Sequence, residues 1–472
     1  MSPTIPPDTA KSVAKGPSRQ AIALALSVGL VLADSSIVVL ALPDIYRSLD
    51  VSVSGVVWVL VAFNLVLAIC AVPAAYAARR LGPARSTVAG LLVFGAASLV
   101  CGISASLPLL LGARCVQAVG GAAAVCGALE LLPAEVGSEQ RAARIWAIAG
   151  ALGAALGPAV GGLLTELVSW ESIFLVQVPL AALAAIALLS TASREGSLDR
   201  ASPEPERPGR PHLAANAALG LVAAALVAAL FLIVLLLIEG WRLSPIAAAA
   251  TVSVMPVAAL LGSPLARVAP NPVARAAAGT ILISGGLAGL ALLPKAVVVA
   301  TIPSQVLIGV GLALTLSALT EAALEGRSRQ AIHGGWTIAF RHAGVVIGLL
   351  VLTPVFTSDL VEQRSAAEAA GTAKLLDADL PPLLKIDIAQ RLTDRLDQER
   401  GRVPVIDPAF EPVPGDPEDR AAVLRLKDAL QDQLDRAATH AFSNSFFIAA
   451  AFALAALLPI AIVRRRPGEV SL

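Results

Sequence analysis

Charged side chains are scarce in this sequence of 472 residues. Asp, Glu, Lys and Arg together make up 15% of the chain and 57% of it is hydrophobic, whereas about a quarter of the residues in soluble globular domains are charged. The mean hydropathy is +0.78. So few polar side chains cannot cover a water-soluble globule, which excludes a soluble protein. A net charge of +1 gives no reason to expect a nucleic-acid partner.

Cysteines and sequence motifs of catalysis are equally sparse. The four cysteines lie inside apolar runs without the spacing of metal ligands, so we expect small buried hydrophobic residues, no disulfide and no metal site. No HExxH, GxSxG or Walker phosphate loop is present, nor a pair of in-membrane carboxylates that could act as acid and base. We therefore expect neither an enzyme nor an ATP-driven protein, and no cofactor.

Long continuous apolar runs account for most of the chain. A helix rises about 1.5 Å per residue and a membrane core is about 30 Å thick, so a run of about 20 residues can span it. Strands of a membrane barrel would alternate apolar and polar residues, which these runs do not do, so the spans are helices. The twelve runs cover residues 20–43, 55–78, 86–104, 107–132, 143–165, 170–191, 214–238, 244–266, 273–293, 296–324, 331–356 and 441–463.

The spans divide into two groups of six. Residues 193–213 carry prolines and mixed charges that cannot build a packed core, and we interpret this segment as a linker. The predicted organisation is a six-helix unit at 1–192, the linker, and a second six-helix unit at 214–472. That second unit includes an insert at 357–440, expected on the outer side.

The distribution of Lys and Arg sets the expected orientation. With both termini in the cytoplasm, the inner segments carry 19 basic residues and the short outer loops carry 3. Because basic residues in short loops favour the cytoplasmic side, this asymmetry predicts that both termini are inside. The chain also has 6 Lys against 29 Arg and much Ala, a pattern that suggests a GC-rich bacterial genome and hence a bacterial inner membrane.

Two charged residues lie where the first and fourth spans cross the membrane. Asp34 is 14 residues into its run, about 21 Å along the helix, and Arg114 is seven residues into a run of the opposite direction, about 10 Å from its outer end. These depths coincide, and a charge in the membrane normally has a partner or faces water. We expect Asp34 and Arg114 to be close. The alternative is that each lines a wet cavity separately.

The second half contains a comparable feature without an evident counter-ion. Arg341 and His342 lie near the middle of the eleventh span, and no intramembrane acid of matching depth accompanies them there. Tryptophans near span ends fit interfacial anchoring, but Trp336 and Phe340 are close to Arg341. We expect the substrate cavity to be lined by polar and aromatic residues of mid-span. These are Asn64, Gln117, Trp336, Phe340, Arg341 and His342.

Several motifs resemble those of one transporter family. "LADSSIVVLALP" resembles the first-helix signature of the drug:proton antiporters of the major facilitator superfamily, and "LLLGARCVQAVGGAA" resembles their fourth-helix motif, with Arg114, Gln117 and Gly120 in place. "GALGAALGPAVGGLL", 150–164, resembles the antiporter motif of the fifth helix. The resemblance implies an all-α membrane protein with the major facilitator fold, although the multidrug branch it resembles usually has fourteen helices, two more than the twelve counted here.

The antiporter motif also has a physical interpretation. Gly153, Gly157, Gly161 and Gly162 form a small-residue face that lets another helix approach closely, and Pro158 bends the helix. A tight contact between the two halves at this face would hinder proton leak. Ordinary helix packing explains the glycines equally well.

The loop after the second span departs from the family pattern. "AAYAARRLGPAR", 74–85, keeps Gly82 and Arg85 but has Ala75 and Arg79 where relatives carry Gly and Asp. The resemblance implies a cytoplasmic gate at this loop, and Glu130 resembles the acid that pairs with it. Glu130 could bind Arg79, Arg80 or Arg85, or it could simply be a solvated interfacial residue.

The insert at 357–440 is acidic and helical in pattern. It holds 17 Asp and Glu against 11 Lys and Arg, and its apolar residues recur at helical spacing on both sides of a proline-rich segment. It is either a solvated, weakly packed hairpin or a cap over the outer mouth that acts as a lid or docks a partner.

These observations predict a transporter that works by alternating access. We expect proton-coupled export of hydrophobic or amphipathic small molecules, with Asp34 and Arg114 as the proton-coupling pair and the protein acting as a monomer in the lipid bilayer. Uptake by proton symport is an alternative, which the fifth-helix motif disfavours. A non-transporting sensor is another, supported by the long insert.

Overall fold

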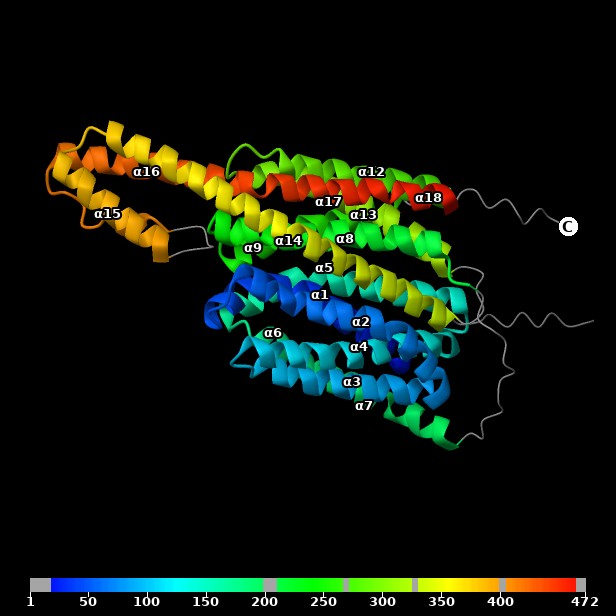
Figure 1. The fold of residues 1–472 in the computed structure, drawn as a ribbon. Helices are drawn as coiled ribbons and strands as arrows, with labels where there is room; N and C mark the ends of the chain where they lie inside the picture. Colours follow the sequence, from blue (N-terminus) through cyan, green and yellow to red (C-terminus); the bar gives the residue numbers. More distant parts are fainter. Residues whose placement is uncertain (1–17, 198–209, 266–270, 325–329, 399–404, 464–472) are drawn as a thin grey trace, which may run out of the picture.

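The chain folds into helices that run along one common axis, with one helical extension projecting from an end (Figure 1). The computed structural model describes residues 18–197, 210–265, 271–324, 330–398 and 405–463. Twelve helices in this part of the chain are long and apolar enough to cross a membrane. This confirms the expected all-α architecture of twelve spans. Most of the expected linker, 193–213, falls outside the described residues.

The first half supplies six spans. Its sixth span combines a single helical turn with the helix that follows. The elements are α1 (Arg19–Ser48), α2 (Val53–Leu81), α3 (Pro83–Gly102), α4 (Leu107–Val136), α5 (Glu139–Leu167), α6 (Ser172–Leu175) and α7 (Gln177–Ser197). Serine hydroxyls start three of these helices, because an N-cap oxygen satisfies a free backbone amide of the first turn. Ser18, Ser52 and Ser138 accept from the amides of Ala21, Gly55 and Arg141.

The second half supplies the other six spans and the insert. Its elements are α8 (Leu213–Leu235), the π-helical turn η1 (Leu236–Gly240), α9 (Pro245–Val252), α10 (Val254–Gly262), α12 (Pro272–Ala291), α13 (Val298–Leu324), α14 (Gln330–Asp377), α15 (Pro382–Gln398), the 3₁₀ turn η2 (Asp407–Phe410), α16 (Pro417–Ala441), α17 (Ser443–Ala455) and α18 (Leu457–Val463). Helices α9 and α10 together form the eighth span, and α17 and α18 lie within the last one.

The two halves repeat the same packing. In the first half α1 packs on α5, α2 on α4, and α3 on both α4 and α7; in the second half α8 packs on α14, α10 on α13, and α12 on both α13 and α17. A close backbone approach also recurs. A Cβ atom on Gly90 would lie 2.6 Å from the Gly120 carbonyl oxygen, and one on Gly279 would lie 2.5 Å from that of Gly311. The halves meet mainly along α2 with α14 and α5 with α9, and less extensively along α4 with α14 and α1 with α8.

The insert continues two membrane spans outward. Helix α14 has 48 residues, about 72 Å of helix, which is far more than a membrane core requires. Helix α16 runs back beside it, and α15 packs against their tip (Figure 1). The insert buries a hydrophobic cluster of its own, made by Leu375, Leu380, Ile388, Ile406, Ala409, Phe410, Ala422, Val423, Leu426 and Leu430. We call the end that carries it the insert end, and the other the opposite end.

Polar contacts attach the base of the insert to the turn after η1. Arg242 donates to Gln431 Oε1 at 2.7 Å and lies 3.7 Å from Asp407, and the Trp241 indole donates to Thr439 Oγ1 at 3.0 Å. The hydrogen bond from Lys427, together with Arg242, holds the pKa of Asp407 below its ordinary value. Asp407 therefore stays ionised in mildly acidic surroundings, and its contribution to stability is lost only as the pH falls through this lowered pKa.

Candidate functional site

An ion pair lies at the centre of the first half. Arg114 on α4 donates through Nη1 to Asp34 Oδ2 on α1, and both side chains are 0% exposed. The fixed rise of the two antiparallel helices brings these residues to one depth, as their positions in the sequence predicted. The pair is the principal buried charge of this half.

Two glutamine amides complete the shell around the carboxylate. Gln117 Nε2 and Gln177 Nε2 donate to Asp34 Oδ1 at 3.2 and 3.0 Å. Gln117 also donates to Gln177 Oε1 at 2.9 Å and to Ser98 Oγ at 2.8 Å, which links α4, α7 and α3. An ionised carboxylate is an acceptor without a proton to donate, so three donors are the partners it requires.

The guanidinium of Arg114 is held from several sides. Its Nε donates to the Val59 carbonyl oxygen at 3.2 Å and its Nη1 to Gln117 Oε1 at 2.7 Å. The rings of Phe63 and Phe174 lie 4.2 and 5.6 Å from its Cζ, close enough for cation–π attraction. Guanidinium stays protonated in proteins, so Asp34 is the member of the pair that can gain and lose a proton.

A short chain of hydrogen bonds connects this site to the second half. Ser35, next to Asp34, donates to Asn64 Oδ1 at 3.2 Å, and His342 Nδ1 on α14 lies 2.6 Å from the same oxygen. Asn64 Nδ2 donates to the Leu60 carbonyl oxygen, so Oδ1 is the acceptor and His342 Nδ1 carries the hydrogen. Asn64 and His342 therefore meet across the boundary between the halves.

The remaining residues expected in the substrate cavity do not lie together. Trp336 and Phe340 contact each other, with ring centroids 6.2 Å apart. Trp336 packs against the buried core of the first half, and at 100° per residue the pair lies on a different side of α14 from Arg341. The structure thus brings Asn64 to His342 and Gln117 to Asp34, and separates the aromatic pair from Arg341.

Most glycines of the fifth span face their own half rather than the boundary. Cβ atoms on Gly153, Gly157 and Gly161 would collide with the α1 backbone around Gly29, Ala33 and Ile37. Gly162 differs, since a Cβ there would collide with Pro245 and Ala249 of α9. Pro158 is buried within α5. The motif therefore seats α1, which carries Asp34, directly against α5, and one of its glycines contacts the other half.

At the opposite end, α2 turns sharply into α3. Gly82 adopts φ +99°, a conformation that side chains with a Cβ rarely take, which explains a glycine at this turn. Arg79 Nε lies 3.7 Å from Glu130 Oε1 on α4, and Arg80 and Arg85 are exposed nearby. The pairing of Glu130 with this loop is thus present, with Arg79 as its partner. Because the Arg79–Glu130 ion pair is partly exposed, it contributes at most about 1 kcal/mol to the stability of the fold.

At the insert end, an ion pair bridges the halves. Arg47 of α1 donates through Nη2 to Glu239 Oε1 of η1 at 2.5 Å. Glu166 of α5 accepts from the Ile246 amide of α9 at 2.7 Å. Sequence inspection did not single out Glu239, although its position in a π-helical turn is typical of functional segments.

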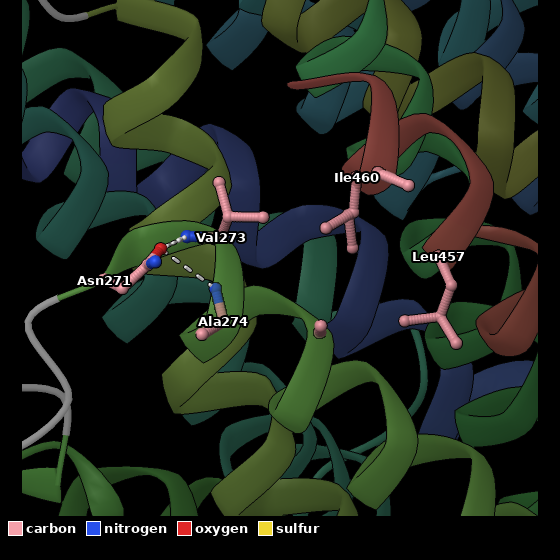
Figure 2. A pocket seen from close by; sticks show the side chains of 7 residues that line it. Asn271, Val273, Ala274, Leu457 and Ile460 are labelled. Carbon is pink, nitrogen blue, oxygen red and sulfur yellow. Dashed lines mark hydrogen bonds between the residues drawn. The ribbon is translucent and has the colours of Figure 1, made fainter. Parts of the chain in front are cut away.

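A shallow crevice of about 350 Å³ lies away from these residues (Figure 2). Figure 2 shows Leu457 and Ile460 of α18 facing the start of α12, where the Asn271 side chain already accepts from the amides of Val273 and Ala274. Its lining is mostly apolar and its one polar side chain is occupied as a helix cap. We assign it no functional role.

The sequence and the fold match a known family. The family model "Major Facilitator Superfamily" matches residues 24–349, and the chain belongs to that superfamily of transporters. The structure of a bacterial homolog to the human lysosomal transporter Spinster, in an inward-facing and unoccupied conformation, covers 95% of this chain and 98% of its own with a TM-score of 0.60. At 18% identity this likeness concerns the fold.

Relatives with closer sequences are drug-resistance proteins. The methylenomycin A resistance protein of Bacillus subtilis is 35% identical over 176 residues, 37% of this chain and 38% of its own. Multidrug resistance protein Stp of Mycobacterium tuberculosis is 36% identical over 165 residues, 34% of this chain and 31% of its own. The tetracenomycin C resistance and export protein of Streptomyces glaucescens is 35% identical over 179 residues, 37% and 33% of the two chains. The matches thus span about a third of these relatives.

Gln177 is the site residue that sequence inspection missed. It lies in "LVQVP", an apolar stretch in which an isolated amide is costly unless it is hydrogen-bonded. That cost is a signal of a buried polar partner, but the sequence does not say which one. The structure supplies it by placing the start of α7 beside Asp34.

Proposed function

We propose that the protein is a proton-coupled antiporter that exports hydrophobic or amphipathic small molecules by alternating access. Membership of the superfamily supports transport, and the drug-resistance relatives support export of such molecules. The observation that carries proton coupling is the fully buried pair of Asp34 with Arg114.

The pair can couple a proton to movement in a simple way. Burial disfavours an ionised carboxylate, while Arg114 and the two amides favour it, so separation of Asp34 from these donors promotes its protonation. Asp34 lies on α1, which packs against α5 and reaches η1 of the other half through Arg47. A relative motion of the halves would therefore change the position of the Asp34 carboxylate relative to its hydrogen-bond donors.

Proton flux gives the test of this function. Purified protein in liposomes, with a pH-sensitive dye inside, should release protons across the membrane when a hydrophobic dye substrate is added on the other side. A coupled antiporter moves the two species in opposite directions. Substrate and protons moving in the same direction would instead establish the uptake symporter, and a sensor would move neither.

Topology can be checked with introduced cysteines. We propose a bacterial inner membrane with the insert outside and both termini in the cytoplasm, on the strength of the basic residues. In a background with the four native cysteines replaced by alanine, Ser365→Cys should react with an impermeant thiol reagent once any outer membrane is opened, and Ser197→Cys should not. The reverse labelling pattern would refute this orientation.

The insert should be dispensable for insertion and for transport. Gly371 lies beside Leu430, so residues 372–429 can be replaced with a short Gly-Ser linker without separating α14 from α16. The deletion removes the part-exposed ion pair of Asp407 with Arg242, which is worth about 0–1 kcal/mol, so export should change by less than about fivefold. Loss of transport by a normally inserted variant would instead favour a lid or a docking site.

A further inference from the structure

The middle of the membrane carries more positive than negative side chains. Asp34 is the one acid at this depth among the described spans, because the others lie near helix ends, as do Asp44, Glu130, Glu135, Glu139, Glu166, Glu239 and Glu321, or in the parts of α14 and α16 that form the insert. Two guanidiniums accompany it. Arg114 pairs with Asp34, whereas Arg341 makes no ion pair or hydrogen bond with any part of the chain that the structure describes.

Hydrogen bonds place Arg341 at the level of the ion pair. Ser35 follows Asp34 directly, and Asn64 joins it to His342, the neighbour of Arg341. One residue of helix corresponds to about 1.5 Å along the axis, so both guanidiniums share one layer of the membrane. With Asp34 ionised, the described side chains of this layer sum to one positive charge.

The side of α14 that carries Arg341 faces the protein rather than lipid. Ile347, Leu350 and Val351 are 52%, 46% and 40% exposed and mark the outer side of the helix. At 100° per residue Arg341 points away from them, between the side where Gly344 meets α8 and the side where His342 meets α2. Its side chain is nevertheless partly exposed, which leaves the cation open to a ligand between the halves.

A second polar atom in this layer also lacks a partner. His342 is 3% exposed, and its Nε2 is buried without a hydrogen bond in the described structure. An unpaired charge inside a membrane costs at least about 2.5–3.5 kcal/mol, so such residues normally have partners. The protein supplies none to Arg341 among its described residues, which leaves the ligand as the candidate.

We propose that Arg341 binds an anionic group of the transported molecule, so that the substrates are hydrophobic molecules carrying a carboxylate or a similar planar oxyanion. The inference rests on the proposed export function. Guanidinium matches a carboxylate with two parallel hydrogen bonds, which an ammonium group cannot do. With the anion bound and Asp34 ionised, the layer carries no net charge, which favours movement of the loaded protein before a proton is taken up.

Equilibrium binding of two matched probes tests this site. Calorimetric titration of the protein in phosphatidylcholine nanodiscs compares 2-naphthylacetate with its neutral amide, 2-naphthylacetamide. Wild type should bind 2-naphthylacetate at least about tenfold more tightly than 2-naphthylacetamide. Arg341→Gln should remove this preference and change amide binding less than about twofold, and Arg341→Lys should retain part of it, since a point charge replaces the planar fork. Arg436→Gln, which removes an exposed arginine of the insert, is the matched control.

Three results would overturn the proposal. Wild type could fail to prefer the anion, or Arg341→Gln could weaken both probes equally, as a merely structural role would. The third is loss of the preference when phosphatidylglycerol is added to the nanodiscs, because the occupant would then be an anionic lipid. Folding is checked separately: removal of an unpaired charge within the membrane should leave the thermal unfolding midpoint unchanged or higher. No gradient is applied, so a failure of proton coupling would leave this result unaffected.

Discussion

Replacement of Asp34 by Asn should abolish export driven by a pH gradient while the protein still inserts, folds and binds substrate. Asn keeps the size of the side chain and an oxygen for the amides of Gln117 and Gln177, but it cannot take up a proton. Accumulation of a fluorescent substrate in inverted vesicles should fall to the level of vesicles without the protein. A tenfold change in the ratio of the inward-open to the outward-open conformation corresponds to about 1.4 kcal/mol of free energy.

Two comparisons make this result specific. Asp407→Asn also removes one ionised carboxylate, but from the insert, and should leave gradient-driven export intact. Arg114→Ala should damage folding as well as coupling, because removal of one partner of a buried pair leaves an uncompensated charge and costs about 3–5 kcal/mol. Full gradient-driven export by Asp34→Asn would show that another group carries the proton.

A single methyl group at Gly153 or Gly344 should destabilise the protein markedly. A Cβ on Gly153 would lie within 3.0 Å of the Gly29 backbone of α1, and one on Gly344 equally close to the Gly220 backbone of α8. Backbone cannot rotate away as a side chain can, so the helices must separate, at a cost of about 1–3 kcal/mol or more. Alanine at either position should lower the midpoint of thermal unfolding in detergent, followed by tryptophan fluorescence.

Glycines in open positions provide the control. Nothing lies within 4 Å of a Cβ built on Gly112 or Gly285, although both are within membrane helices. Alanine there should be neutral or stabilise by up to about 1 kcal/mol, because it restricts the unfolded chain without a clash. Equal unfolding midpoints for all four variants would mean that the close helix approaches do not determine stability.

The position of a residue along its helix was predictable from the sequence. The membrane demands continuous apolar runs and a helix rises by a fixed amount per residue, so span number and depth follow from residue numbers alone. This reasoning anticipated twelve spans and the common depth of Asp34 and Arg114. It also indicated that Arg341 would lack an acid of its own half at its depth.

The direction in which a side chain points was much harder to predict. Trp336 and Phe340 are near Arg341 in sequence, yet they lie on another side of α14, because successive residues are rotated by 100° and only packing decides which neighbour each side contacts. For the same reason the glycines of α5 could not be assigned to a partner. Four of them contact α1 of their own half, namely Gly150, Gly153, Gly157 and Gly161.

The sequence by itself therefore determined that this is a membrane protein of twelve spans with one acid in mid-membrane, because hydropathy and helical rise are properties of each segment alone. Only the tertiary structure decided which helices are neighbours. The packing of the helices places two glutamine donors beside Asp34 and brings Asn64 to His342 across the halves. It leaves Arg341 without a counter-ion among the described residues. These contacts depend on how separate segments pack against each other, and no single segment encodes its neighbour.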